Sequence, residues 1–285
     1  MKTRLNLSVG AFVRFGALGL AAVVSAGSPA MAGFNYSDFS STSGLTLAGA
    51  ATVTGNTIAV TPSEAQVAGG VWYTDSKQNV AGGFTTDFAV RVYNKQGQGA
   101  DGFAFVIQNS APAPLGGAGG AIGYASNVWY GQTGIPNSLA VELDLWNNSG
   151  RGWDDYPQYP IKTSIQTNGL LPNQPDQEHS LGAAPIPNVG DGQVHNVRIT
   201  YAGGMMSVYV DDLTTPVLTQ AVNLSSILSL DNGTAWVGIT AATGGATDEQ
   251  AQELRSWSFS GGDIPSPTGA AVLGLGGLAV LRRRR

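Results

Sequence analysis

Hydrophobic and polar residues alternate along several segments of this 285-residue chain. In residues 84–92, Phe, Thr, Phe, Val and Val fall on one face of an extended segment, while Thr, Asp, Ala and Arg fall on the other. Side chains of a strand point alternately to opposite faces of a sheet, so this pattern predicts a half-buried strand. Residues 196–201 and 206–210 repeat the alternation on either side of Ala202-Gly203-Gly204, which predicts a β-hairpin. No segment sustains the period of a helix.

Further segments have the composition of strands, and their connections are rich in Gly, Asn and Pro. These segments are residues 102–108, 139–146, 161–167, 235–240 and 254–259. Many strands without helices predict an all-β fold, a sandwich or jelly roll of antiparallel sheets. Residues 109–119 and 170–190 exceed the usual length of a connection, which makes them candidate binding loops.

The first 32 residues have the order of a secretory signal peptide. Three basic residues precede an apolar run over residues 15–24, and small residues end the segment at Ala32. The run is about half of the ~20 residues that a bilayer span requires. We therefore expect cleavage after Ala32 and an exported protein, with a membrane anchor as the alternative.

Residues 264–285 are unlike a folded domain. Ile-Pro-Ser-Pro at residues 264–267 is followed by an apolar stretch over residues 268–281 and then by four arginines. This order resembles a PEP-CTERM sorting tail, the bacterial signal handled by exosortases, although Ser266 stands where that family usually has Glu. The resemblance implies a place on the bacterial cell surface or outside the cell. A permanent C-terminal membrane anchor is the alternative.

The central segment, residues 33–263, is long enough for one sandwich domain with a sizeable core. It carries 7 basic and 19 acidic residues, hence a net charge of −12. This charge argues against nucleic acid and anionic membranes as partners. The chain has no cysteine, so an exported domain must be stabilised by its core or by a bound metal ion.

Acidic residues gather at the end of one strand-like segment. If residues 139–146 form a single strand, Glu142, Asp144 and Trp146 share one face and the aliphatic residues between them face the core. Two carboxylates about 7 Å apart repel each other unless a positive charge lies between them. Calcium meets that need because it binds oxygen atoms of carboxylates, amides and carbonyls. A suitable ligand set is Asp144, the Trp146 carbonyl, Asn148, and Asp154 or Asp155. A solvated polar face is the alternative interpretation.

This acidic segment resembles the metal-binding strand of legume lectins and of the wider L-type lectin family. Other segments resemble that family in the same order: residues 100–105 (Ala-Asp-Gly-Phe-Ala-Phe), 119–123 (Gly-Gly-Ala-Ile-Gly), 236–244 and 254–259. The similarity extends from about residue 34 to residue 260. It implies one concanavalin-A-like jelly-roll domain over most of the central segment.

The resemblance implies a calcium-dependent lectin that binds glycans without cleaving them. The implied sugar contacts are the carboxylate of Asp101, the backbone of Gly120, the amide of Asn148, and the ring of Trp146 or of a nearby aromatic residue. The implied specificity loop contains Gly244, Gly245, Ala246 and Thr247. In the family the peptide bond at the position of Ala100-Asp101 is cis. The sequence does not name the sugar, and an oligomer is compatible with it.

One position departs from the family pattern. Plant members bind a second, transition metal through a His at the start of the strand that follows, and Lys162 stands near that position. The resemblance therefore implies calcium only. We expect the ammonium of Lys162 to lie against Glu142 in place of the second metal.

Two alternatives to a lectin are an enzyme and a structural surface protein. Glycoside hydrolases of similar shape carry three carboxylates along one strand. In this chain Glu142 and Asp144 would match the first two, and the third is missing. His195 opens the predicted hairpin and is best explained as a structural residue, while His179 lies in a long loop. A structural or adhesive protein on a lectin scaffold stays open, because fold does not fix function.

Overall fold

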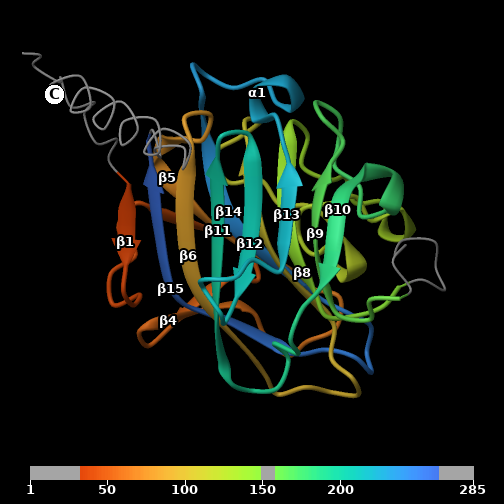
Figure 1. The fold of residues 1–285 in the computed structure, drawn as a ribbon. Coiled ribbons are helices and arrows are strands. Elements are labelled where there is room, and N and C mark those ends of the chain that lie inside the picture. The colour runs from red at the N-terminus through yellow and green to blue at the C-terminus, as the bar shows by residue number, and fades with distance from the viewer. Residues whose placement is uncertain (1–32, 149–157, 263–285) are drawn as a thin grey trace, which may run out of the picture.

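The computed structural model describes residues 33–148 and 158–262. Within these ranges fifteen strands form two antiparallel sheets that pack face to face (Figure 1). The prediction of an all-β sandwich of antiparallel sheets is confirmed. The predicted signal peptide, the predicted sorting tail, Asp154 and Asp155 lie outside the described residues. No helix within them is long and apolar enough to cross a membrane.

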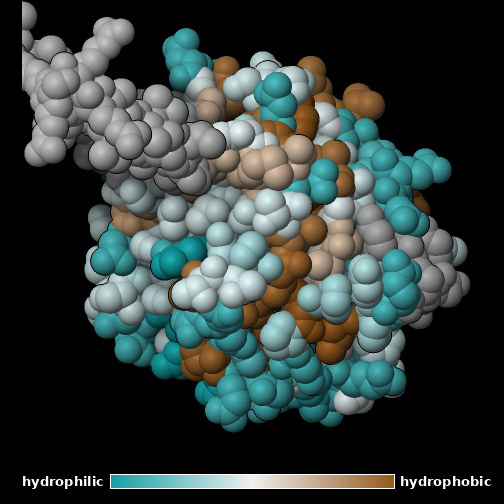
Figure 2. Space-filling model, viewed as in Figure 1, coloured by the Kyte–Doolittle hydropathy of each residue, from teal (hydrophilic) through white to brown (hydrophobic). Residues whose placement is uncertain are grey.

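One sheet has eight strands, in the order β13-β12-β11-β6-β15-β4-β3, with β1 also paired to β15. Their bounds are β1 Phe34–Tyr36, β3 Thr52–Thr54, β4 Thr57–Thr61, β6 Phe84–Tyr93, β11 Val194–Ala202, β12 Met205–Val210, β13 Leu218–Ala221 and β15 Ala251–Gly261. The space-filling view shows hydrophobic groups across the middle of one face of the molecule and hydrophilic groups along its lower rim (Figure 2).

The other sheet has seven strands, in the order β10-β9-β8-β7-β14-β5-β2. Their bounds are β2 Leu45–Gly49, β5 Ala68–Asn79, β7 Asp101–Gln108, β8 Ser138–Asp144, β9 Lys162–Thr167, β10 Ser180–Pro185 and β14 Thr234–Thr243. The described helical turns are short: η1 Gly119–Ala121, η2 Val128–Tyr130, η4 Gln177–His179 and α1 Leu224–Ile227.

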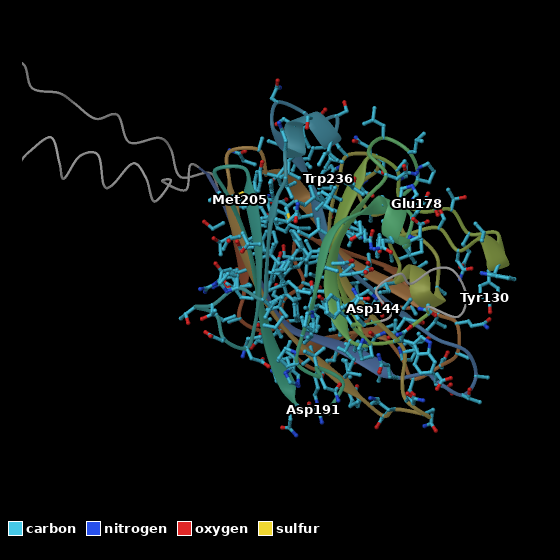
Figure 3. The ribbon with its side chains drawn as sticks, turned by 45° about the vertical axis from the view of Figure 1, so that its right-hand side comes forward. Tyr130, Asp144, Glu178, Asp191, Met205 and Trp236 are labelled. Atoms are coloured by element: carbon cyan, nitrogen blue, oxygen red, sulfur yellow. The ribbon has the colours of Figure 1, made fainter. Side chains whose placement is uncertain are left out.

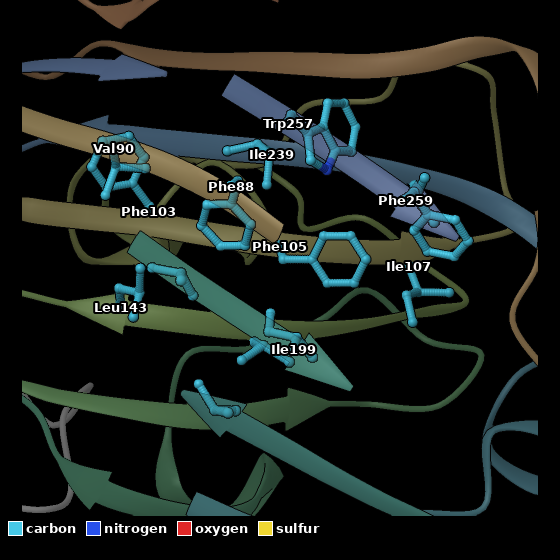
Figure 4. Packing of buried hydrophobic residues seen from close by; sticks show 14 of the residues in the cluster. Phe88, Val90, Phe103, Phe105, Ile107, Leu143, Ile199, Ile239, Trp257 and Phe259 are labelled. Carbon is cyan, nitrogen blue, oxygen red and sulfur yellow. The ribbon is translucent and has the colours of Figure 1, made fainter. Parts of the chain in front are cut away.

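The main core lies between the two sheets and is built by the period-two pattern. Phe88 and Val90 of β6 meet Phe103 and Phe105 of β7 in one buried cluster (Figure 4). The β11–β12 hairpin adds alternate residues to the same cluster and turns at Gly203 and Gly204, whose φ angles are +57° and +77°. Such angles favour glycine, which explains the Gly-Gly pair between the two predicted strands.

The outer face of the seven-stranded sheet is also covered. Trp72 of β5, Val106 of β7 and Ala140 of β8 pack in a second buried cluster against the segment that connects β7 and β8. That segment contributes Ile122, Tyr124, Ile135 and neighbouring residues. The connection therefore has an apolar anchor of its own, which fixes the position of the glycine-rich turn within it.

Candidate functional site

A pocket of about 430 Å³ lies at one end of the seven-stranded sheet, where β7 begins and the loops after β8 and β14 follow their strands. Its lining residues are Gln66, Ala100, Asp101, Gly119, Gly120, Asn127, Trp129, Tyr130, Trp146, Asn148, Gly244, Gly245, Thr247 and Asp248. All but one of the eight residues expected to contact sugar are among them. The exception is Ala246, which is exposed and does not line the pocket.

Asp101 is held in the pocket by backbone contacts at the start of β7. Its carbonyl oxygen accepts a hydrogen bond from the Leu145 N–H at 2.8 Å, and the Gly244 N–H donates to the Ala100 oxygen at 3.3 Å. The Ala100-Asp101 peptide bond is cis, as the family resemblance implies. Gly102 has φ +147°, and a Cβ there would lie 2.1 Å from the Leu143 oxygen. Close pairing with β8 therefore requires glycine at this position.

The glycine-rich turn η1 presents Gly119 and Gly120 to the pocket. The Ala118 N–H donates to Gln132 Oε1 at 2.9 Å, and Asn127 Nδ2 donates to the Ala118 oxygen at 2.8 Å. Gly119 has φ +67°, a conformation that side chains rarely adopt. Because neither glycine carries a side chain, a ligand can approach the backbone of this turn closely.

Asn148 and Trp146 reach the pocket from the turn that follows β8. The strand ends at Asp144, so the prediction that Trp146 continues the face of Glu142 and Asp144 is wrong. The physical reason is a local turn in which Asp144 Oδ1 accepts the Trp146 N–H at 2.9 Å. A carboxylate that bonds the backbone two residues later favours a turn over an extended strand.

Glu142 lies behind the pocket and is enclosed by hydrogen-bond donors. The residue is 2% exposed. Oε2 accepts from the Tyr124 hydroxyl at 2.6 Å, and Oε1 accepts from Ser164 Oγ at 2.5 Å. The alternative of a solvated polar face is therefore wrong, and the expected ion pair between Glu142 and Lys162 is wrong as well.

Lys162 instead pairs with Asp144. Its Nζ donates to Asp144 Oδ2 at 2.5 Å, and the two residues are 2% and 6% exposed. The antiparallel register of β8 and β9 places Lys162 opposite Asp144 and Ser164 opposite Glu142. The Lys162 ammonium therefore neutralises Asp144 at the end of β8. The hydroxyl groups of Tyr124 and Ser164 donate hydrogen bonds to Glu142, which lies within the strand.

The expected calcium ligands are of the right chemical type. The negative charge at the site also depends on Asp154 and Asp155, which lie outside the described residues. Asp144, the Trp146 carbonyl and Asn148 offer the oxygen atoms that calcium prefers. Within residues 33–148 and 158–262 no three acidic, His or Cys residues form a group that could hold a metal ion. Since Lys162 pairs with Asp144, further negative charge for calcium would come from Asp154 or Asp155, which lie outside the described residues.

The loop after β14 closes the pocket from the opposite side. The Gly244 oxygen accepts the Gln66 N–H at 2.8 Å, and the Asp248 N–H donates to the Gly245 oxygen at 2.9 Å. Asp248 Oδ1 also accepts the Gln98 N–H at 3.3 Å. A Cβ on Gly245 would meet nothing within 4 Å. Substitution at this position can therefore change the pocket without disturbing the fold.

Besides Ala100 and Gly119, which lie in the motifs named above, five further pocket residues were not predicted from the sequence. They are Gln66, Asn127, Trp129, Tyr130 and Asp248. The sequence signal that could have identified some of them was the run Val-Trp-Tyr at residues 128–130, where bulky apolar residues are flanked by Asn127 and Gly131 in a turn.

Residues 170–190 were a candidate binding loop. They instead contain η4 and the edge strand β10, and none of them lines the pocket.

Both histidines lie away from the pocket. His195 Nδ1 and Nε2 lie 2.9 Å from Asp211 Oδ2 and Asp191 Oδ1 respectively, which matches the predicted structural role. Partial burial alone would lower the pKa of His195, but the hydrogen bonds and charges of Asp191 and Asp211 outweigh it and raise the pKa. His179 pairs with Asp176 at the surface.

Residues 35–256 match the family model of the legume lectin beta-barrel domain. This chain belongs to the legume lectin family. It is similar to a lectin of Bauhinia forficata, with 27% identity over 238 residues that cover 80% of this chain and 94% of that protein. The solved structure of the Bauhinia forficata lectin in complex with GalNAc superimposes with a TM-score of 0.64 and 26% identity, covering 81% of this chain and 97% of the other.

Peanut lectin, solved with a nine-residue peptide, has a similar fold. Its TM-score is also 0.64 at 24% identity, over 81% of this chain and 97% of peanut lectin. These likenesses support the jelly-roll sandwich as the fold of this legume lectin domain.

Proposed function

We propose that the protein is a non-catalytic lectin that binds glycans in the pocket lined by Asp101, Gly120 and Asn148. The observation that carries the proposal is the meeting of these three residues in one pocket, although they come from three separate segments: the start of β7, the turn η1 and the turn after β8. An ionised carboxylate accepts hydrogen bonds from sugar hydroxyls, and an amide side chain both donates and accepts. Trp146 adds an apolar surface beside them.

The same arrangement favours binding over hydrolysis. A retaining glycoside hydrolase needs two carboxyl groups about 5–5.5 Å apart on either side of the scissile bond. Glu142 and Asp144, the pair that such an enzyme would use, do not line the pocket and are engaged by Tyr124, Ser164 and Lys162. A structural protein without a ligand is the remaining alternative, and the experiments below separate the two.

We propose further that calcium orders the turn after β8. Asp144, the Trp146 carbonyl and Asn148, with Asp154 or Asp155, would hold the ion, which would fix the Asn148 amide relative to Asp101. A second metal is not part of the proposal, because Lys162 already supplies positive charge beside Asp144. Calcium should raise the thermal midpoint of unfolding relative to a chelator. An unchanged midpoint would contradict this part of the proposal.

We propose an extracellular or surface location for residues 33–263, after removal of the first 32 residues. The domain boundaries at Ala32 and residue 264 are part of this proposal. A sorting tail would gather many copies on the cell surface, and clustering or oligomerisation raises the avidity of weak single sites. Cell fractionation and mass spectrometry of the mature ends test it; an unprocessed cytoplasmic chain would contradict it.

The binding proposal is tested with Asp101→Asn, matched to Glu178→Gln. Both changes replace a carboxylate by an amide of nearly the same shape, but Glu178 lies in η4, outside the pocket. N-acetylgalactosamine is the first probe, because the Bauhinia forficata relative was solved with GalNAc, followed by a panel of neutral sugars. We expect Asp101→Asn to weaken binding at least tenfold, because a charge-assisted hydrogen bond is lost. Glu178→Gln should bind like the wild type. Equal binding by all three proteins would contradict the assigned pocket.

A further inference from the structure

We propose that Trp129 and Tyr130 form a second binding surface, which contacts the sugar unit next to the one held in the pocket. This inference rests on the proposed lectin function and deepens it. The two residues lie in the short hairpin between Asn127 and Gln132, which is named the aromatic hairpin below. The preferred ligand would then be a neutral oligosaccharide and not a monosaccharide.

The aromatic hairpin lies partly in the pocket and partly in solvent. Trp129 and Tyr130 both line the pocket, yet their exposed fractions are 69% and 51%. Figure 3 shows Tyr130 at the outer margin of the molecule, far outside the position of Asp144. A ligand confined to the interior of the pocket would leave most of these two rings uncovered. A ligand that extends outward past the rim would cover them.

The base of the aromatic hairpin is fixed to the glycine-rich turn. Asn127 is buried, and its Nδ2 donates to the Ala118 oxygen while its Oδ1 accepts the Trp129 N–H at 3.1 Å. The Asn127 and Gln132 backbones exchange two hydrogen bonds of 2.9 Å each. The hairpin turns at Gly131, whose φ is +63°. Its backbone is therefore held by the same residues that shape the sugar pocket.

The outer ring of the hairpin is tethered as well. The Tyr130 hydroxyl accepts a hydrogen bond from Gln66 Nε2, and the Gln66 backbone is bonded to Gly244 in the opposite loop. This chain of contacts joins the two walls of the pocket across its rim. Because the Tyr130 ring is already tethered, it loses little conformational entropy when a ligand covers it.

The chemistry of the hairpin suits a neutral sugar ring. The faces of a pyranose carry C–H groups, and flat aromatic side chains offer a large apolar area to such a face. Residues 127–132 carry no charge. The titratable acids that line the described pocket are Asp101 and Asp248, and no Lys or Arg of the described residues lines it. From the described residues an anionic glycan would therefore meet repulsion and no counter-charge.

Folding alone gives no reason for this arrangement. Val128, Trp129 and Tyr130 are all among the most exposed large apolar residues of the described chain, so none of them adds much to a core. Exposed apolar groups that adjoin a pocket are typical of binding surfaces. Val128 differs in one respect, because it does not line the pocket. It is the matched control for its two neighbours.

The test compares Trp129→Ala, Tyr130→Ala and Val128→Ala in the full chain. The probes are four series of mono-, di- and trisaccharides. Within a series all members share one non-reducing terminal sugar, which is N-acetylgalactosamine, galactose, fucose or mannose. The wild type should bind the longer members of at least one series about tenfold more tightly than the monosaccharide, as expected for covering a large side chain. Trp129→Ala should lose most of that gain, so that its affinities for the monosaccharide and the trisaccharide lie within about twofold of each other. Val128→Ala should keep the gain.

A fluorescence measurement keeps the test independent of how well the alanine variants fold. The spectrum of the wild type minus that of Trp129→Phe isolates the exposed Trp129. This difference spectrum should shift to shorter wavelength with the trisaccharide and stay unchanged with the monosaccharide, because only the longer ligand covers the ring.

Several results would overturn the inference while the lectin function stands. One is equal wild-type affinity for all lengths of a series, and another is an equal loss for monosaccharide and trisaccharide in Trp129→Ala. A third is an effect of Trp129→Ala on self-association alone, measured by light scattering, which would make the hairpin an interface between proteins. A folded wild type that binds no member of any series would instead overturn the proposed function and this inference together.

Discussion

Two neighbouring regions of this lectin domain contain buried acidic residues and use them in different ways. At the acidic end of β8, Glu142 and Asp144 are enclosed by Tyr124, Ser164 and Lys162. In the pocket, Asp101 is equally buried but faces a space lined by glycines and aromatic rings. Glu142 and Asp144 do not line the pocket, whereas Asp101 does, and a buried carboxylate that lines a pocket can serve a ligand. Substitutions in the first region should therefore change stability, and substitutions in the second should change binding.

The largest effect on stability should follow Lys162→Met. Removing the ammonium leaves the Asp144 carboxylate buried without this counter-charge, which typically costs about 3–5 kcal/mol of unfolding free energy. Urea unfolding measures it. Lys77→Met is the matched control, because Lys77 pairs with an exposed Asp231 and such surface pairs contribute about 0–1 kcal/mol. Equal losses in the two variants would remove the distinction between a buried and a surface pair.

Lys162→Met also tests whether calcium binds beside Asp144. Without the ammonium, the acidic end of β8 gains one unit of negative charge. We expect calcium to stabilise this variant more than the wild type when both are compared with a chelator. A smaller calcium effect in the variant would mean that Lys162 supports the ion and does not compete with it.

A smaller loss should follow Tyr124→Phe. The change removes the hydroxyl that donates to Glu142 and leaves the ring in the second buried cluster. Losing one donor to a buried carboxylate costs about 1–3 kcal/mol. Thermal or urea unfolding should show this loss, while glycan affinity stays within about twofold of the wild type. A selective loss of binding would place Glu142 in the functional region instead.

The smallest effect concerns His195, which lies outside both regions. Its pKa is raised above the ordinary value of 6.5, so the folded state holds the proton more tightly than the unfolded state. The resulting stabilisation is fully present below the unfolded pKa and is lost as the pH rises through the raised folded pKa. His195→Gln should abolish this part of the pH dependence without changing glycan binding. An unchanged pH profile of unfolding would contradict the assigned pairs with Asp191 and Asp211.

Sequence reasoning succeeded where a local pattern determines the structure. The strict alternation of β6 and the Gly-Gly turn of the β11–β12 hairpin are local properties, and both predictions are confirmed. The partner of Lys162 was predicted wrongly because strand register depends on distant residues. A shift between facing residues decides whether the ammonium meets Asp144 or Glu142.

The candidate site was predicted only in part, because local motifs identify some of its residues while others are brought in by distant segments. Asp101, Gly120 and Asn148 lie in segments with a recognisable motif, and the structure brings them together. Trp129 and Tyr130 were missed because a run of exposed apolar residues has no period to follow. Gln66 and Asp248 reach the pocket only through the arrangement of separate loops. Strand β10, Ser-Leu-Gly-Ala-Ala-Pro, lacks the alternation and β-branched residues that identify strands from sequence.

The most direct test of the central claim is a glycan-array screen of the full chain, performed with calcium and repeated with a chelator. The account predicts binding to a few related neutral glycans in calcium and weaker or no binding with the chelator. Binding that ignores the chelator would contradict the role of calcium and leave the lectin function intact. No binding under either condition, from protein with an intact β-sheet spectrum, would contradict the lectin function and favour a structural surface protein.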